Sequence, residues 1–127
     1  MKKQISTNNA PQAIGPYSQG IATEGLVFIS GQLPINAATG VMPEDVAEQA
    51  KESLNNLQAI LKESGLTMND IVKTTIFLAD MNDFVVANEV YGSFFSEPFP
   101  SRSTVEISRL PKDAKIEIEA IAVKKGE

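Results

Sequence analysis

The sequence has 127 residues, of which 43% are hydrophobic and 21% charged, a size and composition that fit one globular domain over residues 1–127. Its net charge of −5 leaves no basic surface for the phosphates of nucleic acid or for an anionic membrane. The absence of cysteine and histidine excludes disulfides, thiolate nucleophiles, metal sites built on thiolate or imidazole, and the usual general base.

The first half of the chain is expected to form strands followed by one long helix. Short edge strands are indicated near KQIS and QGIAT, and the run LVFIS at 26–30 predicts a longer strand. Between residues 42 and 66, apolar residues recur at helical spacing, with acidic residues beside Pro43 for a first turn and Gly65 for the end. The apolar positions of this helix are Val46, Ala50, Leu54, Leu57 and Leu61.

The second half is expected to alternate strands with one further helix. The run 71–79 predicts a strand, and the segment 82–97 predicts a helix with an aromatic stripe. Strands are expected again at 103–107 and 115–123, joined by the segment SRLPKDA as a hairpin loop. The stripe consists of Phe84, Ala87, Tyr91, Phe94 and Phe95.

This order of elements predicts an α+β sandwich, in which two helices cover one face of a mixed sheet. The strands 71–79 and 115–123 carry large apolar residues on both sides, although two helices can cover only one face. We therefore expect the second face to pack on another subunit. No apolar run approaches the length that spans a bilayer, so we expect a cytoplasmic protein with no membrane partner.

The polar residues on these strands suggest a site for a small acid. Arg102 opens the strand 103–107 in the segment FPSRSTVEI, and Glu117 lies in the last strand. One interpretation is surface ion pairing of Arg102 or Arg109 with glutamates. The other is a carboxylate-binding site, in which the guanidinium of Arg102 holds the ligand and a glutamate acts as acid or base or orients a water.

The hairpin limits how these two residues could cooperate. A symmetric hairpin puts Glu117 opposite Glu106, which is four residues, or about 13 Å, from Arg102 along its strand. One small substrate would not touch both in one chain. Either Arg102 and Glu117 do not cooperate, or the site is assembled across a subunit interface.

Four further positions have a structural and a ligand-binding interpretation. Tyr17 in IGPYSQG fits a half-exposed turn residue, and Asn88 fits a solvated position of the second helix. Ser30 and Gly31 fit the exit of a strand, although glycine also lets a ligand approach backbone N–H groups. The glycine spacing matches neither the dinucleotide nor the P-loop pattern, so no nucleotide cofactor is expected.

Several motifs together resemble one protein family over nearly the whole chain. NAPQAIGPYSQG, ISGQLP, DIVKTTIFLADMNDF, NEVYGSFF and PSRSTVEISRLPKDAKIEIEAIAV are similar, in order and spacing, to the Rid family of reactive intermediate deaminases, also called the YjgF family. The resemblance implies a chorismate-mutase-like fold and a homotrimer with clefts between subunits. It also implies a 2-iminobutanoate/2-iminopropanoate deaminase, which hydrolyses enamines and imines such as 2-aminoacrylate to 2-keto acids and ammonia without a metal or organic cofactor.

The resemblance also assigns roles to individual residues. Arg102 matches the arginine that holds the substrate carboxylate, and Glu117 matches the glutamate associated with the hydrolytic water. Thr104 stands where many relatives have cysteine, and the connection SEPFPS is shorter than in some members. The residues that match the lining of the cleft are Tyr17, Ser30, Gly31, Asn88, Arg102 and Thr104.

Two alternatives to the deaminase remain open. A non-catalytic regulatory protein could use the same cleft to bind 2-keto acids. An RNA-directed activity is opposed by the acidic charge and by the absence of histidine.

Overall fold

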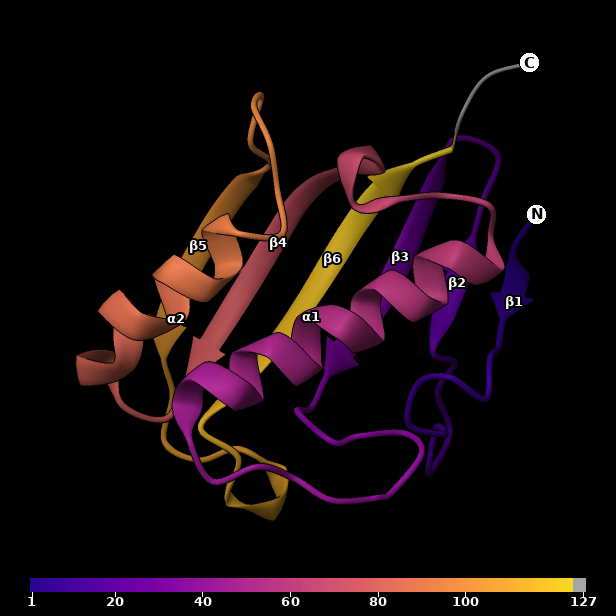
Figure 1. Ribbon diagram of the computed structural model, residues 1–127. Helices are drawn as coiled ribbons and strands as arrows, with labels where there is room; N and C mark the ends of the chain where they lie inside the picture. The colour runs from indigo at the N-terminus through magenta and orange to yellow at the C-terminus, as the bar shows by residue number, and fades with distance from the viewer. Residues whose placement is uncertain (125–127) are drawn as a thin grey trace.

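The computed structural model describes residues 1–124, which form a six-stranded sheet with two helices on one face (Figure 1). The strands are β1 (Lys3–Ile5), β2 (Gly20–Ala22), β3 (Leu26–Gln32), β4 (Ile71–Leu78), β5 (Ser101–Glu106) and β6 (Ile116–Val123). They lie in the order β1-β2-β3-β6-β4-β5, and only β4 and β5 pair in parallel. The predicted mixed sheet with two helices is confirmed.

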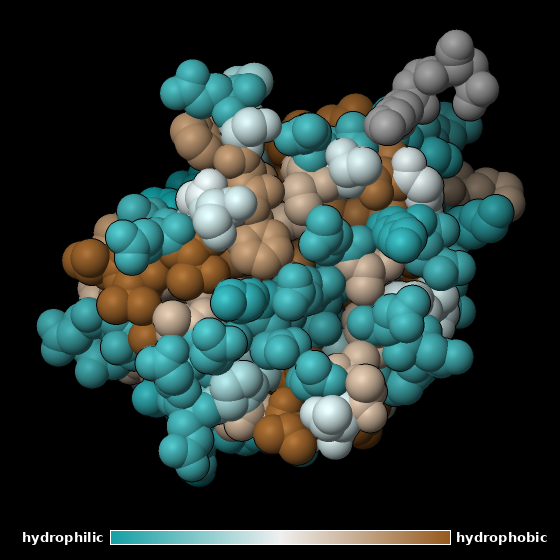
Figure 2. Space-filling model, viewed as in Figure 1, coloured by the Kyte–Doolittle hydropathy of each residue, from teal (hydrophilic) through white to brown (hydrophobic). Residues whose placement is uncertain are grey.

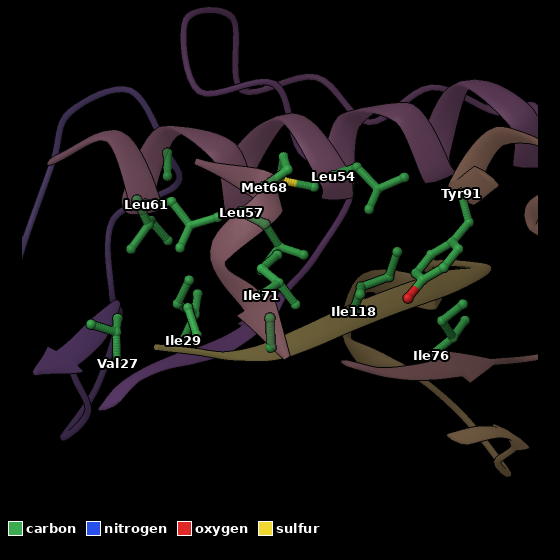
Figure 3. Packing of buried hydrophobic residues seen from close by; sticks show 14 of the residues in the cluster. Val27, Ile29, Leu54, Leu57, Leu61, Met68, Ile71, Ile76, Tyr91 and Ile118 are labelled. Carbon is green, nitrogen blue, oxygen red and sulfur yellow. The ribbon is translucent and has the colours of Figure 1, made fainter. Parts of the chain in front are cut away.

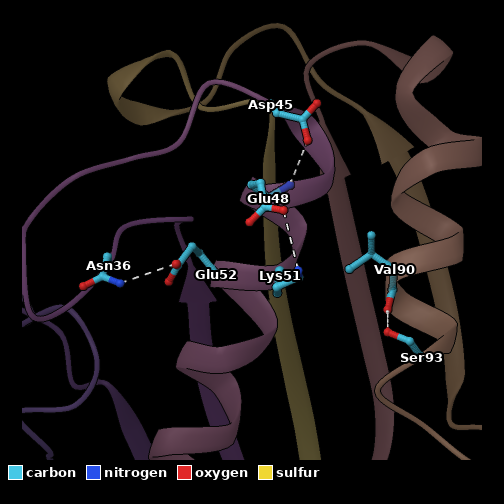
Figure 4. A network of polar contacts seen from close by, with 7 residues as sticks. All are labelled: Asn36, Asp45, Glu48, Lys51, Glu52, Val90 and Ser93. Atoms are coloured by element: carbon cyan, nitrogen blue, oxygen red, sulfur yellow. Dashed lines mark hydrogen bonds and ion pairs between the residues drawn. The ribbon is translucent and has the colours of Figure 1, made fainter.

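The helices are α1 (Val46–Glu63) and α2 (Phe84–Gly92), both shorter than the predicted segments. α1 begins after Asp45, whose carboxylate accepts a hydrogen bond from the backbone N–H of Glu48, so Pro43 precedes the helix instead of lying in its first turn (Figure 4). α2 ends at Gly92. Phe94 and Phe95 follow the helix, but they still pack against the core as their apolar character requires.

The core lies between α1 and the sheet. Leu54, Leu57 and Leu61 on α1 point toward strand residues such as Val27, Ile29 and Ile118 (Figure 3). The outward side of α1 is hydrophilic, whereas hydrophobic residues gather over α2 (Figure 2). Val85 of α2 is 75% exposed. The helical spacing of apolar residues in α1 therefore predicts its buried side correctly. Neither helix within residues 1–124 is both long and apolar enough to cross a membrane.

The predicted hairpin between residues 103–107 and 115–123 is wrong, because β4 lies between β5 and β6. The chain from β4 to β5 crosses over the sheet through α2, and such a crossover makes neighbouring strands parallel. After the loop at Pro111–Asp113, β6 enters on the other side of β4 and pairs antiparallel with both β4 and β3. The distance inferred from the hairpin register therefore no longer holds.

The alternation predicted for β4 also fails at its first residues. The pairing with β6 shifts between Ile71 and Lys73, as at a β-bulge. Ile71 is therefore 4% exposed and lies in the core near Leu57, whereas Val72 is 42% exposed (Figure 3). From Thr74 onward, the predicted alternation is confirmed.

The sheet face away from the helices, here called the open face, carries no covering element in residues 1–124. Along β6 the even-numbered residues are buried under the helices and the odd-numbered ones face the other way. Five large hydrophobic residues belonging to this uncovered side are between 37% and 42% exposed: Leu26, Phe28, Val72, Val105 and Val123. The sequence predicts this apolar surface, and a group of exposed large hydrophobic residues on one face is typical of an interaction site.

Candidate functional site

The predicted site residues fall into two separate hollows. The arginine half-site is a cavity of about 420 Å³ lined by Asn88, Tyr91, Gly92, Phe99, Pro100 and Arg102. The carboxylate half-site is a cavity of about 600 Å³, and its lining includes Tyr17, Ser30, Gly31 and Glu117. Thr104 is in neither lining, although it lies two residues beyond Arg102 on the same strand.

The Arg102 side chain is held by the residues of α2. Its guanidinium carbon lies 4.9 Å from the ring centroid of Tyr91 and 5.5 Å from that of Phe84. Its Nη1 donates a 2.7 Å hydrogen bond to Oδ1 of Asn88. One nitrogen of the fork is thus engaged by Asn88, and the exposed position leaves the fork open to a ligand carboxylate.

The surface ion-pair interpretation of Arg102 is wrong. Among residues 1–124, Arg102 makes no ion pair with any carboxylate. Arg109 does make one, but its partner is Asp113 in the adjoining loop, at 2.7 Å, and not a glutamate of β6. An arginine with aromatic support and no carboxylate partner is the arrangement expected of an anion-binding group.

Tyr91 connects Arg102 to the core. The hydroxyl groups of Tyr91 and Thr74 share a buried hydrogen bond of 2.7 Å, and Thr74 stands opposite Arg102 in the β4–β5 register. Burial raises the pKa of Tyr91, against the opposite effects of the Thr74 hydrogen bond and the Arg102 charge. The neutral ring therefore remains in place beneath the guanidinium at neutral pH.

Glu117 is the acidic residue in the lining of the carboxylate half-site, which also includes Lys112. Its side chain lies on the open face and is half-buried. Burial raises the pKa of Glu117 above its usual value, and the neighbouring charge of Glu119 raises it further. The carboxyl is therefore easier to protonate than an exposed glutamate, as a proton donor requires.

Hydrogen bonds from buried amide side chains hold the loops around the carboxylate half-site in place, and sequence reasoning missed these residues. Gln19 accepts from the backbone N–H of Thr7 and donates to the carbonyls of Thr7, Ala10 and Pro11, which closes the loop containing Tyr17. Asn56 donates to the carbonyls of Leu33 and Ile35, 3.0 Å each. Ser30 donates to the carbonyl of Ser18 at 2.7 Å.

No sequence signal distinguishes these positioning residues from ordinary polar ones. Gln19 lies in a loop, and Asn56 interrupts the apolar side of α1 without a recognisable motif. Phe84 and Tyr91 do have a signal, the aromatic stripe, but that stripe equally fits a core-facing helix. The contact of these two rings with the Arg102 guanidinium becomes visible only in the tertiary structure, where Arg102 of β5 lies against α2.

The two half-sites lie on opposite faces of the sheet. Arg102 pairs with Thr74, which is buried beneath the helices, and its side chain stacks on α2. Glu117 lies on β6, which β4 separates from β5. It pairs with Phe77 of β4, and its side chain is on the open face. One chain cannot present both side chains to a ligand of a few atoms. The two alternatives stated from the sequence therefore stand: Arg102 and Glu117 belong to independent sites, or a second subunit completes one site.

The raised pKa of Glu117 predicts a specific pH dependence of stability. Ionising Glu117 costs folding free energy, and this cost grows as the pH rises from the ordinary pKa of 4.5 through the raised one. The unfolding free energy of the wild type should therefore fall relative to that of Glu117→Gln across this window and then level off. Urea denaturation at a series of pH values measures the difference, with Glu24→Gln, an exposed glutamate, as the control. Parallel curves for wild type and Glu117→Gln would contradict the assignment.

Comparison with known proteins adds the family context of this site. A family model described as Endoribonuclease L-PSP matches residues 7–124. A curated Escherichia coli (strain K12) protein named 2-iminobutanoate/2-iminopropanoate deaminase is 55% identical over 128 residues, covering 98% of this chain and 100% of that protein.

Solved structures agree with the fold. The crystal structure of the E. coli YjgF gene product is 55% identical, with a TM-score of 0.93 and coverage of 97% of this chain and 99% of that one. The crystal structure of E. coli TdcF with bound serine is 52% identical, with the same TM-score and coverage. Similarity of this extent concerns the whole chain and not one motif.

Proposed function

The chain belongs to the endoribonuclease L-PSP family, which includes YjgF, and on this premise we propose that it is a 2-iminobutanoate/2-iminopropanoate deaminase. The observation that carries the proposal is the full-length, 55% identity to the E. coli protein of that name. The reaction adds water to R–C(=NH)–COO⁻ and gives R–C(=O)–COO⁻ and NH₃. An enamine such as 2-aminoacrylate reacts after it tautomerises: its methylene carbon gains a proton and its nitrogen loses one, which produces the imine.

The proposed active site is assembled between subunits of a homotrimer. In a closed ring each interface joins two different surfaces, so the arginine half-site of one subunit can face the carboxylate half-site of the next. Two observations support this arrangement: the half-sites lie on opposite faces of the sheet, and the open face exposes a set of large hydrophobic residues. Burying that face would remove the apolar surface from water while completing the site.

Each half-site has a distinct task in the proposed mechanism. The guanidinium of Arg102, fixed by Asn88 and Tyr91, binds the substrate carboxylate and places the imine carbon. The protonated Glu117 gives its proton to the imine nitrogen, which makes the carbon more electrophilic. The resulting carboxylate accepts a proton from the attacking water and passes it to the nitrogen. As ammonia leaves, the carboxylate takes the hydroxyl proton of the tetrahedral intermediate, which forms the keto acid and restores protonated Glu117.

This chemistry suits the side chains that the sequence provides. The imine carbon is already electrophilic, so its hydrolysis needs a placed substrate, a proton and a water more than it needs a strong nucleophile. Tyr17, Ser30 and Gly31 belong to the carboxylate half-site and would border the reacting atoms, with Asn88 beside the substrate carboxylate. Thr104 would lie near that carboxylate through its backbone, because it is two residues beyond Arg102.

A coupled assay tests the proposed function. A pyridoxal-phosphate-dependent dehydratase generates 2-aminoacrylate from serine, and the rate of pyruvate formation is followed with and without the protein. Acceleration over spontaneous hydrolysis supports the deaminase, and no acceleration rejects it. Binding of 2-oxobutanoate without turnover would favour the regulatory alternative, and salt-sensitive cleavage of RNA would favour a nuclease.

The carboxylate half-site also predicts a preference among imino acids. Leu33 and Ile35 line it, together with Ile14, so an aliphatic substrate side chain would meet an apolar wall. Leu33→Ala should lower kcat/KM by about 10-fold for an imine with a four-carbon side chain, because a hydrophobic contact has been removed. The imine from 2-aminoacrylate, which has only a methyl group, should lose about threefold or less. Equal losses for the two substrates would contradict the assignment of this wall.

A further inference from the structure

Gly31 lies directly against the side chain of Glu117. A Cβ atom added to Gly31 would overlap Oε2 of Glu117 and would lie 2.9 Å from its Cδ and 3.1 Å from its Cγ. Real Cβ atoms essentially never lie within 3.0 Å of such a neighbour, so the carboxyl would have to leave its position. The backbone of Gly31 is not among the left-handed glycines, which are Gly15, Gly40 and Gly65. Space for the neighbouring carboxyl, and not backbone conformation, is therefore what requires glycine here.

A β-bulge brings Gly31 to this position. Ile29 pairs with Ala120 and Gln32 pairs with Ile118, so two residues of β3, Ser30 and Gly31, stand opposite the single residue between those partners. Ile29 and Gln32 are both buried beneath the helices. Without the extra residue, strict alternation would put position 31 on the helix side. The bulge instead places it between two buried neighbours, where it meets Glu117 from the open face.

We propose that Gly31 is a positioning residue: the space left by its missing side chain seats the Glu117 carboxyl against the backbone of β3. This inference rests on the proposed function and deepens it, because it assigns Gly31 a steric role toward Glu117 in addition to its place at the edge of the reacting atoms. The space beside Gly31 keeps the carboxyl at the wall of the cavity, where it is partly removed from water. The burial that raises the pKa of Glu117 agrees with this placement.

The expected consequence is a loss of rate that acts through Glu117. In Gly31→Ala, the added methyl group would overlap the carboxyl oxygen, so the carboxyl must move away. Proton transfer should then slow by about 100-fold. The coupled assay with 2-aminoacrylate measures this rate in the full-length protein. Gly25→Ala is the matched control, because a Cβ at Gly25 has no neighbour within 4 Å and its φ is ordinary. Its rate should stay within about twofold of the wild type.

A double-mutant cycle separates this steric role of Gly31 toward Glu117 from its other roles. Melting temperatures are measured for the wild type, Gly31→Ala, Glu117→Ala and the double variant. Because the carboxyl is the far end of a flexible side chain, Gly31→Ala should lower Tm by only about 1–3 °C in the wild-type background. The change should disappear in Glu117→Ala, where no carboxyl needs the space. If Gly31→Ala alone fails to fold, recovery of folding in the double variant supports the steric role of Gly31 toward Glu117.

Two outcomes would contradict the proposal that Gly31 positions the Glu117 carboxyl. An equal fall in Tm in both backgrounds means that the methyl group collides with something other than Glu117. A rate for Gly31→Ala near that of the wild type means that the carboxyl does not need this position. If the wild type itself shows no deaminase activity, the proposed function fails, while the cycle of melting temperatures still decides whether Gly31 seats Glu117.

Discussion

Arg102→Lys is expected to lower kcat/KM for imine hydrolysis by about 100-fold or more, even though the positive charge remains. Two parallel charge-assisted hydrogen bonds to the substrate carboxylate depend on the planar guanidinium, each contributes about 1.5–3 kcal/mol, and an ammonium group does not reproduce their geometry. The stacking on Tyr91 and Phe84 would be lost as well. The loss should appear mainly in KM if Arg102 binds the substrate and transition state equally, and in kcat if it also aligns the imine carbon.

Arg109→Lys is the matched control for this experiment. Arg109 is the other arginine of the sequence, and it forms an exposed ion pair with Asp113 that lysine can maintain. Exposed pairs contribute little to stability, so kcat/KM should remain within about twofold of the wild type. Activity of Arg102→Lys equal to that of Arg109→Lys would show that Arg102 does not hold the substrate.

Mixing two inactive variants is expected to restore activity. Arg102→Ala has an intact carboxylate half-site and Glu117→Gln has an intact arginine half-site. In trimers assembled at random from equal amounts, half of the subunits supply Arg102 and half supply Glu117, so about a quarter of the interfaces contain both. Activity should therefore rise from near zero to about a quarter of the wild-type value.

The mixing experiment needs subunit exchange, which is achieved by unfolding the two variants together in urea and refolding them. Each variant taken alone through the same steps is the control, and refolded wild type defines full activity. A mixture that stays inactive while the wild type recovers would mean that Arg102 and Glu117 act within one chain, against their placement on opposite faces of the sheet. Size-exclusion chromatography of the refolded mixture verifies that the oligomer has formed again.

Elements with strong local patterns were predictable. The 3.6-residue period of α1 identified its buried side, because a single amphipathic helix against a sheet has only one way to bury its apolar stripe. Alternation in β6 likewise separated Ile116 and Ile118 from Glu117 and Glu119. The bulge in β4 was not predictable, because the sequence 71–73 contains no residue that distinguishes a shifted pair from a regular one.

Strand pairing was the main error. The loop between residues 106 and 116 looks like a hairpin because it is short and contains proline and aspartate. Local turn chemistry cannot show that β4 is inserted between its two ends, since that insertion depends on α2 carrying the chain across the sheet. The error mattered for function. The hairpin register predicts a separation of Arg102 and Glu117 along one face, whereas the observed strand order places their side chains on opposite faces of the sheet.

The sequence by itself determined the chemical inventory: an arginine and a glutamate, with no histidine or cysteine to replace them. It also determined the two helices and the two-sided apolar character of the sheet, since these follow from the periodicity of neighbouring residues. Only the tertiary structure decided that Arg102 rests on Tyr91 and Asn88, that Glu117 fits over Gly31, and that the two lie on opposite faces. The physical reason is that these contacts join residues distant in the chain, and their geometry depends on strand order and on bulges that short-range patterns do not encode.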